Sequence, residues 1–196
     1  MGLKIPKVIG LVGAPACGKS TIAQVLASKL SLAGNNVRLI QEYPRAYIEE
    51  HGHPKHISEQ IIFFHRWRKS IENAIKIGYD YIVCDSPVFV CYIYGTMLCQ
   101  MTLPNETEML GDLLQLCIKD SLRYSQVFYI KAGKKFRVDD NLRVSSHKIS
   151  EAIDSKISSF LSLYKVNHNI VVNKEFDDTI ADIIGYINTP KLNRIK

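Results

Sequence analysis

The chain reads Gly13-Ala14-Pro15-Ala16-Cys17-Gly18-Lys19-Ser20 directly after the apolar run Lys7–Val12. This segment has the pattern G-x-x-x-x-G-K-[ST], and it opens a helical pattern, which is the context that gives the pattern its meaning. Glycines at both ends allow backbone N–H groups to surround phosphate oxygens, while the start of the helix directs its positive end at the same anion. The alternative is a chance glycine-rich turn, which the matching flanks disfavour. The segment, together with Thr21 that follows it, therefore predicts a binding loop for nucleotide phosphates.

A metal site is expected beside this loop. Lys19 would neutralise the β- and γ-phosphates, and the Ser20 hydroxyl would bind Mg²⁺. Asp85 ends the apolar run Tyr81–Cys84, where a protein with such a loop holds its Mg²⁺-organising carboxylate. The alternative is that Asp85 caps a helix beginning at Pro87, because Asp-Ser-Pro is a good N-terminal signal. Lys19 and Asp85 are therefore candidate catalytic residues, with Ser20 and Asp85 as metal ligands.

Two charged residues follow the second apolar run, Val37–Gln41. Open α/β sheets place their ligands at the carboxyl ends of parallel strands, so Glu42 is a candidate to accept a proton from a substrate hydroxyl. Arg45, one turn further on, could bind the phosphate acceptor or its phosphate. The alternative for this pair is a solvated ion pair at the start of a helix. Glu42 and Arg45 are therefore the candidate acceptor-binding residues.

A basic and polar segment, residues about 131–146, is long enough to be a lid. Phosphoryl transfer benefits from a cation that arrives when the site closes, and Arg137 and Arg143 are the candidates. The alternative is a solvated basic loop with no catalytic part. Arg137 and Arg143 are therefore candidate catalytic residues.

The remaining pattern alternates short apolar runs with longer helical ones, which is typical of βαβ units around a parallel sheet. The strand-like runs are Lys7–Val12, Val37–Gln41, Tyr81–Cys84, Gln126–Ile130 and Asn169–Val172. The helical patterns are Gly18 to Ala33, Ser58 to Ile77, Leu110 to Leu122, Ile149 to Tyr164, and Asp177 to Ile187. In the second helix the spacing assigns to one face Ile61, Ile62, His65, Arg68, Ile71, Ala74 and Ile75. The pattern predicts the α/β class.

Composition narrows the class of protein further. The 196 residues are 46% hydrophobic and 22% charged, which favours one globular domain over residues 1–196 and excludes disordered and disulfide-scaffold classes. Five cysteines without a C-x-x-C pair favour a reducing cytoplasm. No stretch approaches eighteen uninterrupted apolar residues, so no membrane span is expected. A formal net charge of +6 suits polyanionic partners, nucleic acid included, but no block of like charges marks a nucleic-acid tail.

Two other features look functional but have simpler interpretations. His51, His53 and His56, with His65 further on, resemble a metal cluster but have no matching cysteine or carboxylate constellation, so surface histidines are the favoured interpretation. The stretch His65–Lys69 mixes aromatic and basic groups as single-strand binding surfaces do. On a helix these side chains point in different directions, so core packing of Trp67, or a place in a substrate-pocket wall, is favoured over nucleic-acid contact.

Taken in order, four elements resemble the ribosylnicotinamide-kinase-like branch of P-loop kinases, which is more distantly related to deoxynucleoside and nucleoside monophosphate kinases. They are the loop Gly13–Ser20, Glu42-Tyr43-x-Arg45, Asp85, and Asp140-Asn141-Leu142-Arg143. The resemblance implies a three-layer P-loop NTPase fold with a parallel sheet in the order 2-3-1-4-5. It also implies Mg-ATP as donor, Asp85 near the metal and the acceptor, and Arg143 closing on the phosphates.

The expected function is an ATP-dependent kinase that transfers the γ-phosphate to a hydroxyl of a nucleoside- or nucleotide-like small molecule. One alternative is a kinase acting on a nucleic-acid end or a hydroxylated base in DNA. A second alternative is a nucleotide-dependent switch or assembly ATPase that has no acceptor.

Overall fold

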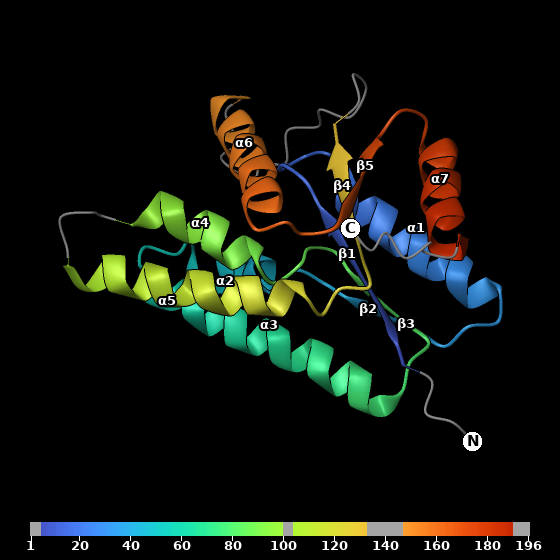
Figure 1. The fold of residues 1–196 in the computed structure, drawn as a ribbon, viewed down its shortest axis with the longest axis horizontal. Helices are drawn as coiled ribbons and strands as arrows, with labels where there is room; N and C mark the ends of the chain where they lie inside the picture. The colour runs from blue at the N-terminus through green and yellow to red at the C-terminus, as the bar shows by residue number, and fades with distance from the viewer. Residues whose placement is uncertain (1–4, 100–103, 133–146, 190–196) are drawn as a thin grey trace.

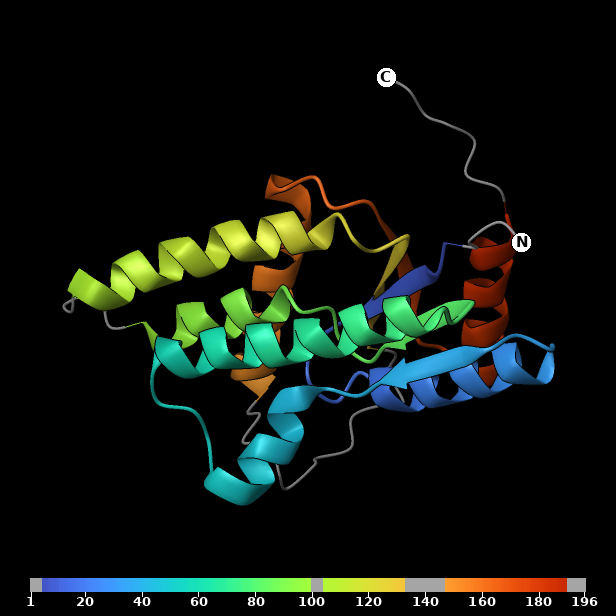
Figure 2. The same cartoon turned by 90° about the horizontal axis from the view of Figure 1, so that it is seen from below.

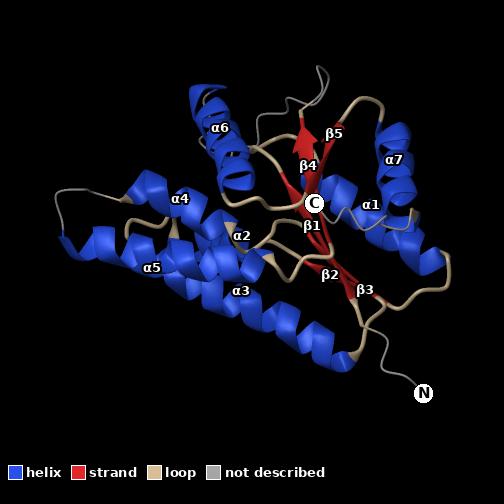
Figure 3. Cartoon of the chain, in the orientation of Figure 1, coloured by secondary structure: helices blue, strands red, loops and turns tan. Residues whose placement is uncertain are grey.

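Five parallel strands form the centre of the molecule in the computed structural model, which describes residues 5–99, 104–132 and 147–189. The strands are β1 (Lys7–Val12), β2 (Val37–Ile40), β3 (Tyr81–Cys84), β4 (Gln126–Lys131) and β5 (His168–Val172). They pair in the order β2-β3-β1-β4-β5, and every pairing is parallel (Figures 1 and 3). The α/β class and the sheet order expected from the sequence are confirmed.

Helices cover both faces of the sheet and complete a three-layer arrangement. They are α1 (Lys19–Leu32), α2 (Tyr43–His51), α3 (Ile57–Ile77), α4 (Val90–Leu98), α5 (Pro104–Ser121), α6 (His147–Leu163) and α7 (Phe176–Asn188). Helices α1 and α7 pack on one face, and α3, α4, α5 and α6 lie on the other (Figures 1 and 2). The sheet is therefore buried on both sides.

Strand β1 shows how the side chains divide between the two layers. Val8 and Val12 belong to the core beneath α3 to α6, whereas Ile9 and Leu11 pack with α1 and α7. All four side chains are at most 2% exposed. Because a doubly covered parallel sheet buries both sets of side chains, its strands are continuous apolar runs. This is why the central strands β1, β3 and β4 are recognisable in the sequence, whereas the edge strands β2 and β5 are only partly buried.

The expected element boundaries need small corrections. Strand β2 ends at Ile40 rather than Gln41, and β5 begins one residue early, at His168. Strand β4 extends to Lys131, so the first residue of the predicted lid belongs to the sheet. Residues 133–146 of that segment lie outside the described residues.

Two helices, α2 and α4, are absent from the periodicity-based expectations. Helix α2 has no fully buried residue, and only Tyr43 and Tyr47 pack against the core. Helix α4 reads VCYIYGTML, which is apolar on nearly every side and shows no clear helical period. It begins at Val90, not at Pro87. No helix in the described ranges is both long and apolar enough to cross a bilayer.

The face of α3 that packs on the core agrees only in part with the expected one: Ile71 and Ala74 are buried, and Ile61 and Ile75 pack against the core. Ile62 is 48% exposed and His65 is exposed. The buried side chains are Ile57, Gln60, Phe63, Phe64, Trp67, Ile71 and Ala74. These positions also recur at helical spacing, and they include Phe63, Phe64 and Trp67. Burial of these large rings favours this face of the helix.

Candidate active site

The loop between β1 and α1 has the backbone shape that a phosphate-binding loop requires. Ala16 and Gly18 have φ angles of 60° and 85°, which turn the chain through the left-handed region before α1 begins. Gly13 has no room for a side chain, because a Cβ there would lie 2.5 Å from the Ile130 carbonyl oxygen and 2.7 Å from the Cys17 Sγ. Strand, loop and helix follow one another as the sequence pattern predicts.

A buried asparagine supports this loop from behind. The Asn173 Nδ2 donates a hydrogen bond of 2.9 Å to the Cys17 carbonyl, and the Thr179 hydroxyl donates to the Asn173 Oδ1 at 3.3 Å. The backbone N–H of Asn173 donates to the Lys131 carbonyl at the end of β4. Asn173 is fully buried, so these contacts fix the loop relative to β4 and α7. The sequence analysis missed Asn173, since it carries no motif and acts only through tertiary contact.

Lys19 and Cys17 occupy the base of the loop. Lys19 is 4% exposed at the first position of α1, so its positive side chain lies at the positive end of the helix dipole and the two together favour an anion at this place. Burial raises the pKa of the Cys17 thiol, although the charge of Lys19 partly opposes this shift. Cys17 is therefore a neutral packing residue rather than a nucleophile.

One cavity of about 350 Å³ joins the metal-binding and acceptor-binding candidates. Its lining includes Ser20 at the start of α1, Asp85 just after β3, and Glu42 and Arg45 around the start of α2. Asp85 is only 7% exposed, and its backbone N–H donates to the Ile40 carbonyl of β2 at 3.0 Å. The four residues converge because β1, β3 and β2 are neighbouring parallel strands that end at the same edge of the sheet.

The structure corrects the alternative interpretation of Asp85 as a helix cap. Helix α4 begins at Val90, and its N-cap residue is Phe89. Asp85 lies further upstream, at the end of β3. Its carboxylate lines the cavity instead of the first turn of α4.

Glu42 and Arg45 both belong to the start of α2. Glu42 is the N-cap residue, and its carbonyl accepts a hydrogen bond from the Arg45 N–H at 3.3 Å. The Arg45 Nε lies 3.9 Å from the Glu49 Oε1, and both side chains are about half exposed. An exposed pair of this kind contributes little stability.

A second cavity, of about 360 Å³, lies beside the first and shares Glu42, Arg45 and Glu49 with it. The phosphate loop, α2, α4 and α6 supply the apolar part of its wall, which consists of Pro15, Pro44, Ile48, Tyr94, Met97, Leu98, Ile149 and Ile153. Gln60 of α3 also lines it. The cavity is mostly apolar with a few polar groups, as small-molecule sites usually are.

Gln60 is the unusual polar residue of this wall. It is 3% exposed, and its Oε1 is buried without a hydrogen-bond partner among the described residues. A buried carbonyl oxygen that has no donor costs free energy, so a ligand N–H or O–H placed against it would be favoured. The sequence analysis missed Gln60, although its helical spacing with Ile57, Phe63 and Phe64 would have marked a polar residue on a buried face.

A protein-family model described as an AAA domain matches residues 8–178, a span that runs from β1 into α7. The chain belongs to this AAA-domain family. None of the curated proteins matches this AAA domain in sequence.

Three solved structures share the fold of this AAA domain. Thymidylate kinase from Ehrlichia chaffeensis has a TM-score of 0.63 at 16% identity, covering 93% of this chain and 98% of its own. Deoxyadenosine kinase from M. mycoides with bound dATP has a TM-score of 0.65 at 16% identity, covering 93% and 100%. NadR protein in complex with NR has a TM-score of 0.61 at 17% identity, covering 98% of this chain and 53% of its own. These likenesses confirm the fold that the resemblance to the ribosylnicotinamide-kinase-like branch implies, and the family match agrees with it.

The remaining residues that the sequence singled out are two arginines, the histidines and Trp67. Arg137 and Arg143 lie outside the described residues and stay predictions. His51 ends α2 with its ring stacked on Tyr47 at 4.6 Å, and His56 is the N-cap residue of α3. In the described ranges no three His, Cys, Asp or Glu side chains group together to hold a metal ion. Trp67 is fully buried, which confirms its packing in the core.

Proposed function

We propose that this AAA domain is an ATP-dependent kinase that transfers the γ-phosphate to a hydroxyl of a nucleoside- or nucleotide-like small molecule. The observation that carries the proposal is the cavity where Ser20 and Asp85 meet Glu42 and Arg45, next to an apolar cavity of similar volume. A kinase needs this combination, because donor phosphates, metal and acceptor hydroxyl must meet in line. The known structures with this fold include one with dATP and one with NR.

The donor set at the first cavity fits magnesium. The Ser20 hydroxyl and the Asp85 carboxylate both line the cavity, and oxygen ligands of these two kinds are those that Mg²⁺ prefers. Magnesium bound there would neutralise charge on the ATP phosphates. The backbone N–H groups of Gly13–Ser20 would bind the phosphate oxygens, and Lys19 would balance the charge of the β- and γ-phosphates.

In the proposed transfer, the acceptor hydroxyl oxygen forms a bond to the γ-phosphorus while the bond from that phosphorus to the β–γ bridging oxygen breaks. ADP leaves, and the hydroxyl proton passes to the Glu42 carboxylate. Arg45 orients the acceptor beside Glu42. Arg137 and Arg143, both in the segment 131–146, are proposed to stabilise the charge on the transferring group.

The second cavity is proposed to hold the rest of the acceptor. Its apolar wall suits a planar heterocycle, and the buried Gln60 Oε1 would accept a hydrogen bond from a ring N–H or an amino group once the side chain rotates toward the cavity. Among the described residues, Glu42, Glu49 and Arg45 lie at the shared border of the two cavities, where polar groups of the acceptor would meet them.

The cysteines support the proposal that the protein works in a reducing compartment such as the cytoplasm. All five are free thiols in the structure. Cys17, Cys84, Cys91 and Cys117 are buried, whereas Cys99 is partly exposed. Burial raises the pKa of the Cys84, Cys91 and Cys117 thiols, so these side chains stay neutral and pack as small apolar groups.

The proposal is tested with γ-labelled ATP, a pool of nucleosides, a pool of nucleotides, and DNA in separate reactions. Label is expected in a nucleoside with the wild-type chain and to be lost with Lys19→Ala. The matched control is Lys29→Ala, which removes an exposed lysine from the same helix and leaves transfer intact. Label appearing in DNA would favour a nucleic-acid kinase. Label released only as inorganic phosphate, whatever the acceptor, would favour a switch or assembly ATPase.

A further inference from the structure

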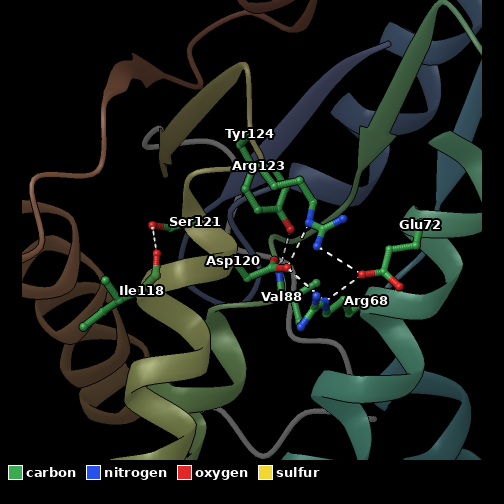
Figure 4. A network of polar contacts seen from close by, with 8 residues as sticks. All are labelled: Arg68, Glu72, Val88, Ile118, Asp120, Ser121, Arg123 and Tyr124. Carbon is green, nitrogen blue, oxygen red and sulfur yellow. Dashed lines mark hydrogen bonds and ion pairs between the residues drawn. The ribbon is translucent and has the colours of Figure 1, made fainter. Parts of the chain in front are cut away.

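Four charged side chains form a network between α3 and the end of α5 (Figure 4). The Arg123 Nε lies 2.9 Å from the Asp120 Oδ1, and the Arg123 Nη2 lies 3.3 Å from the Glu72 Oε1. The Arg68 Nε lies 2.8 Å from the same Glu72 oxygen and 3.8 Å from the Asp120 Oδ1. The Asp120 side chain is 1% exposed, so removing one partner would leave a buried charge. The network fixes the turn that follows α5 against α3.

Tyr124 extends from this turn toward the end of β3. Its hydroxyl oxygen accepts a buried hydrogen bond of 2.8 Å from the Val88 N–H. Its ring packs edge-on against the ring of Phe89, with centroids 6.2 Å apart. Val88 is three residues after Asp85, so the Tyr124 hydroxyl fixes the turn that directly follows the proposed metal-binding residue.

Strand β1 presses on the same turn from the other side. A Cβ at Gly10 would lie 3.1 Å from the Tyr124 Cδ1 and 3.2 Å from the Pro87 Cγ. The backbone of β1, the tyrosine ring and the proline ring are therefore in close contact, with no space for another methyl group. A methyl group added at Gly10 would therefore require one of these rings to move by a few tenths of an ångström, and Pro87 is two residues from Asp85.

We propose that Tyr124 is a positioning residue for Asp85. The charged network fixes the turn that contains Tyr124. The Tyr124 hydroxyl binds the Val88 N–H, and this hydrogen bond fixes the backbone that follows Asp85. A carboxylate that organises a metal must be held in place by its surroundings. Removing a residue that supports a metal ligand usually lowers metal affinity or activity by about 10- to 100-fold. This inference rests on the proposed function, because it assigns Asp85 to the magnesium site.

The test compares the ATP affinity of purified variants in EDTA and in Mg²⁺ by calorimetry, together with the Mg²⁺ concentration that gives half-maximal turnover. Tyr124→Phe removes the acceptor of the Val88 N–H and keeps the ring. It is expected to raise the Mg²⁺ requirement about tenfold and to reduce the Mg²⁺-dependent gain in ATP affinity, leaving affinity in EDTA unchanged. Gly10→Ala keeps the hydroxyl and displaces the same turn, so it is expected to shift both measurements in the same direction.

The matched control is Ser125→Ala. The Ser125 Oγ also accepts a backbone hydrogen bond, from the Val8 N–H at 3.2 Å, but at the start of β1 rather than beside Asp85. This variant is expected to lose thermal stability with no change in Mg²⁺ requirement. The inference would be overturned if both Tyr124→Phe and Gly10→Ala kept the wild-type Mg²⁺ requirement and the wild-type Mg²⁺-dependent gain in ATP affinity. If Tyr124→Phe does not fold, the result for Gly10→Ala alone decides the question. A wild-type chain whose ATP affinity ignores Mg²⁺ would overturn this inference and the proposed metal site together.

Discussion

Replacing Gln60 by leucine tests the acceptor cavity most directly. The Gln60 Oε1 is buried without a partner among the described residues, and such a carbonyl costs about 1–3 kcal/mol. Leucine has a similar volume and no polar atom, so Gln60→Leu is expected to stabilise the protein without ligand. A gain of about 1 kcal/mol corresponds to a melting temperature about 2–4 °C higher in a chain of this size. The same change leaves a donor of the bound acceptor unpaired, which costs about 1–3 kcal/mol and raises the acceptor KM about 5- to 150-fold.

The assay is a thermal melt of the free protein, followed by steady-state kinetics with the labelled nucleoside at saturating Mg-ATP. The matched control, Gln115→Leu, makes the same substitution on an exposed position of α5 and should change neither quantity by much. The expected pattern is a more stable protein that binds its acceptor less well, with an unchanged KM for ATP. A Gln60→Leu variant that melts lower and keeps its acceptor KM would refute the reasoning, because Gln60 would then be a structural residue.

Three further changes test other parts of the site and fold. Asp85→Asn should keep the ATP affinity that calorimetry measures in EDTA but lose the Mg²⁺-dependent gain in affinity and abolish Mg²⁺-dependent turnover, since the amide keeps the shape and loses the charge. Arg143→Ala should lower the transfer rate about 10³-fold while ATP affinity stays within a few fold, and unchanged turnover would remove Arg143 from the mechanism. Burial raises the pKa of Glu59, but hydrogen bonds from two backbone N–H groups and a tyrosine hydroxyl outweigh it, so the pKa lies below its ordinary value of 4.5. Such a carboxylate stabilises the fold above that value, and the contribution is lost as the pH falls through the lower folded pKa, so urea titrations of Glu59→Gln should show a flatter loss of stability below about pH 4.5.

The sheet could be predicted from the sequence because its three central strands, β1, β3 and β4, are buried on both faces. A run such as Tyr81–Cys84 has no polar residue to interrupt it, and its end is marked by Asp85, where the chain reaches the ligand-binding edge. The phosphate loop could be predicted because its function depends on local backbone shape. Gly18 is required by its own left-handed dihedral angle. Gly13 is required by its contacts with Cys17 in the loop and with Ile130 of β4, the strand beside β1 in the sheet.

The acceptor cavity and the supports of the site could not be predicted in the same way. The cavity wall comes from α2, α4 and α6, and neither α2 nor α4 has the amphipathic period that reveals a helix. Asn173 and Tyr124 act on loops that are distant in sequence, through one hydrogen bond each to Cys17 and Val88. Such residues are ordinary in their own sequence neighbourhood, and only the folded chain shows what they contact.

The partial exposure of one cysteine gives the native chain a place for a reporter dye. A thiol-reactive fluorophore needs an accessible thiolate, and burial raises the pKa of the other four thiols and shields them. Cys99 directly follows Leu98, which lines the acceptor cavity at the end of α4. A dye attached to the unaltered protein should therefore label Cys99 first and sense the filling of that cavity. One labelled sample, titrated with candidate nucleosides one after another, would rank acceptors by fluorescence before any phosphate is transferred.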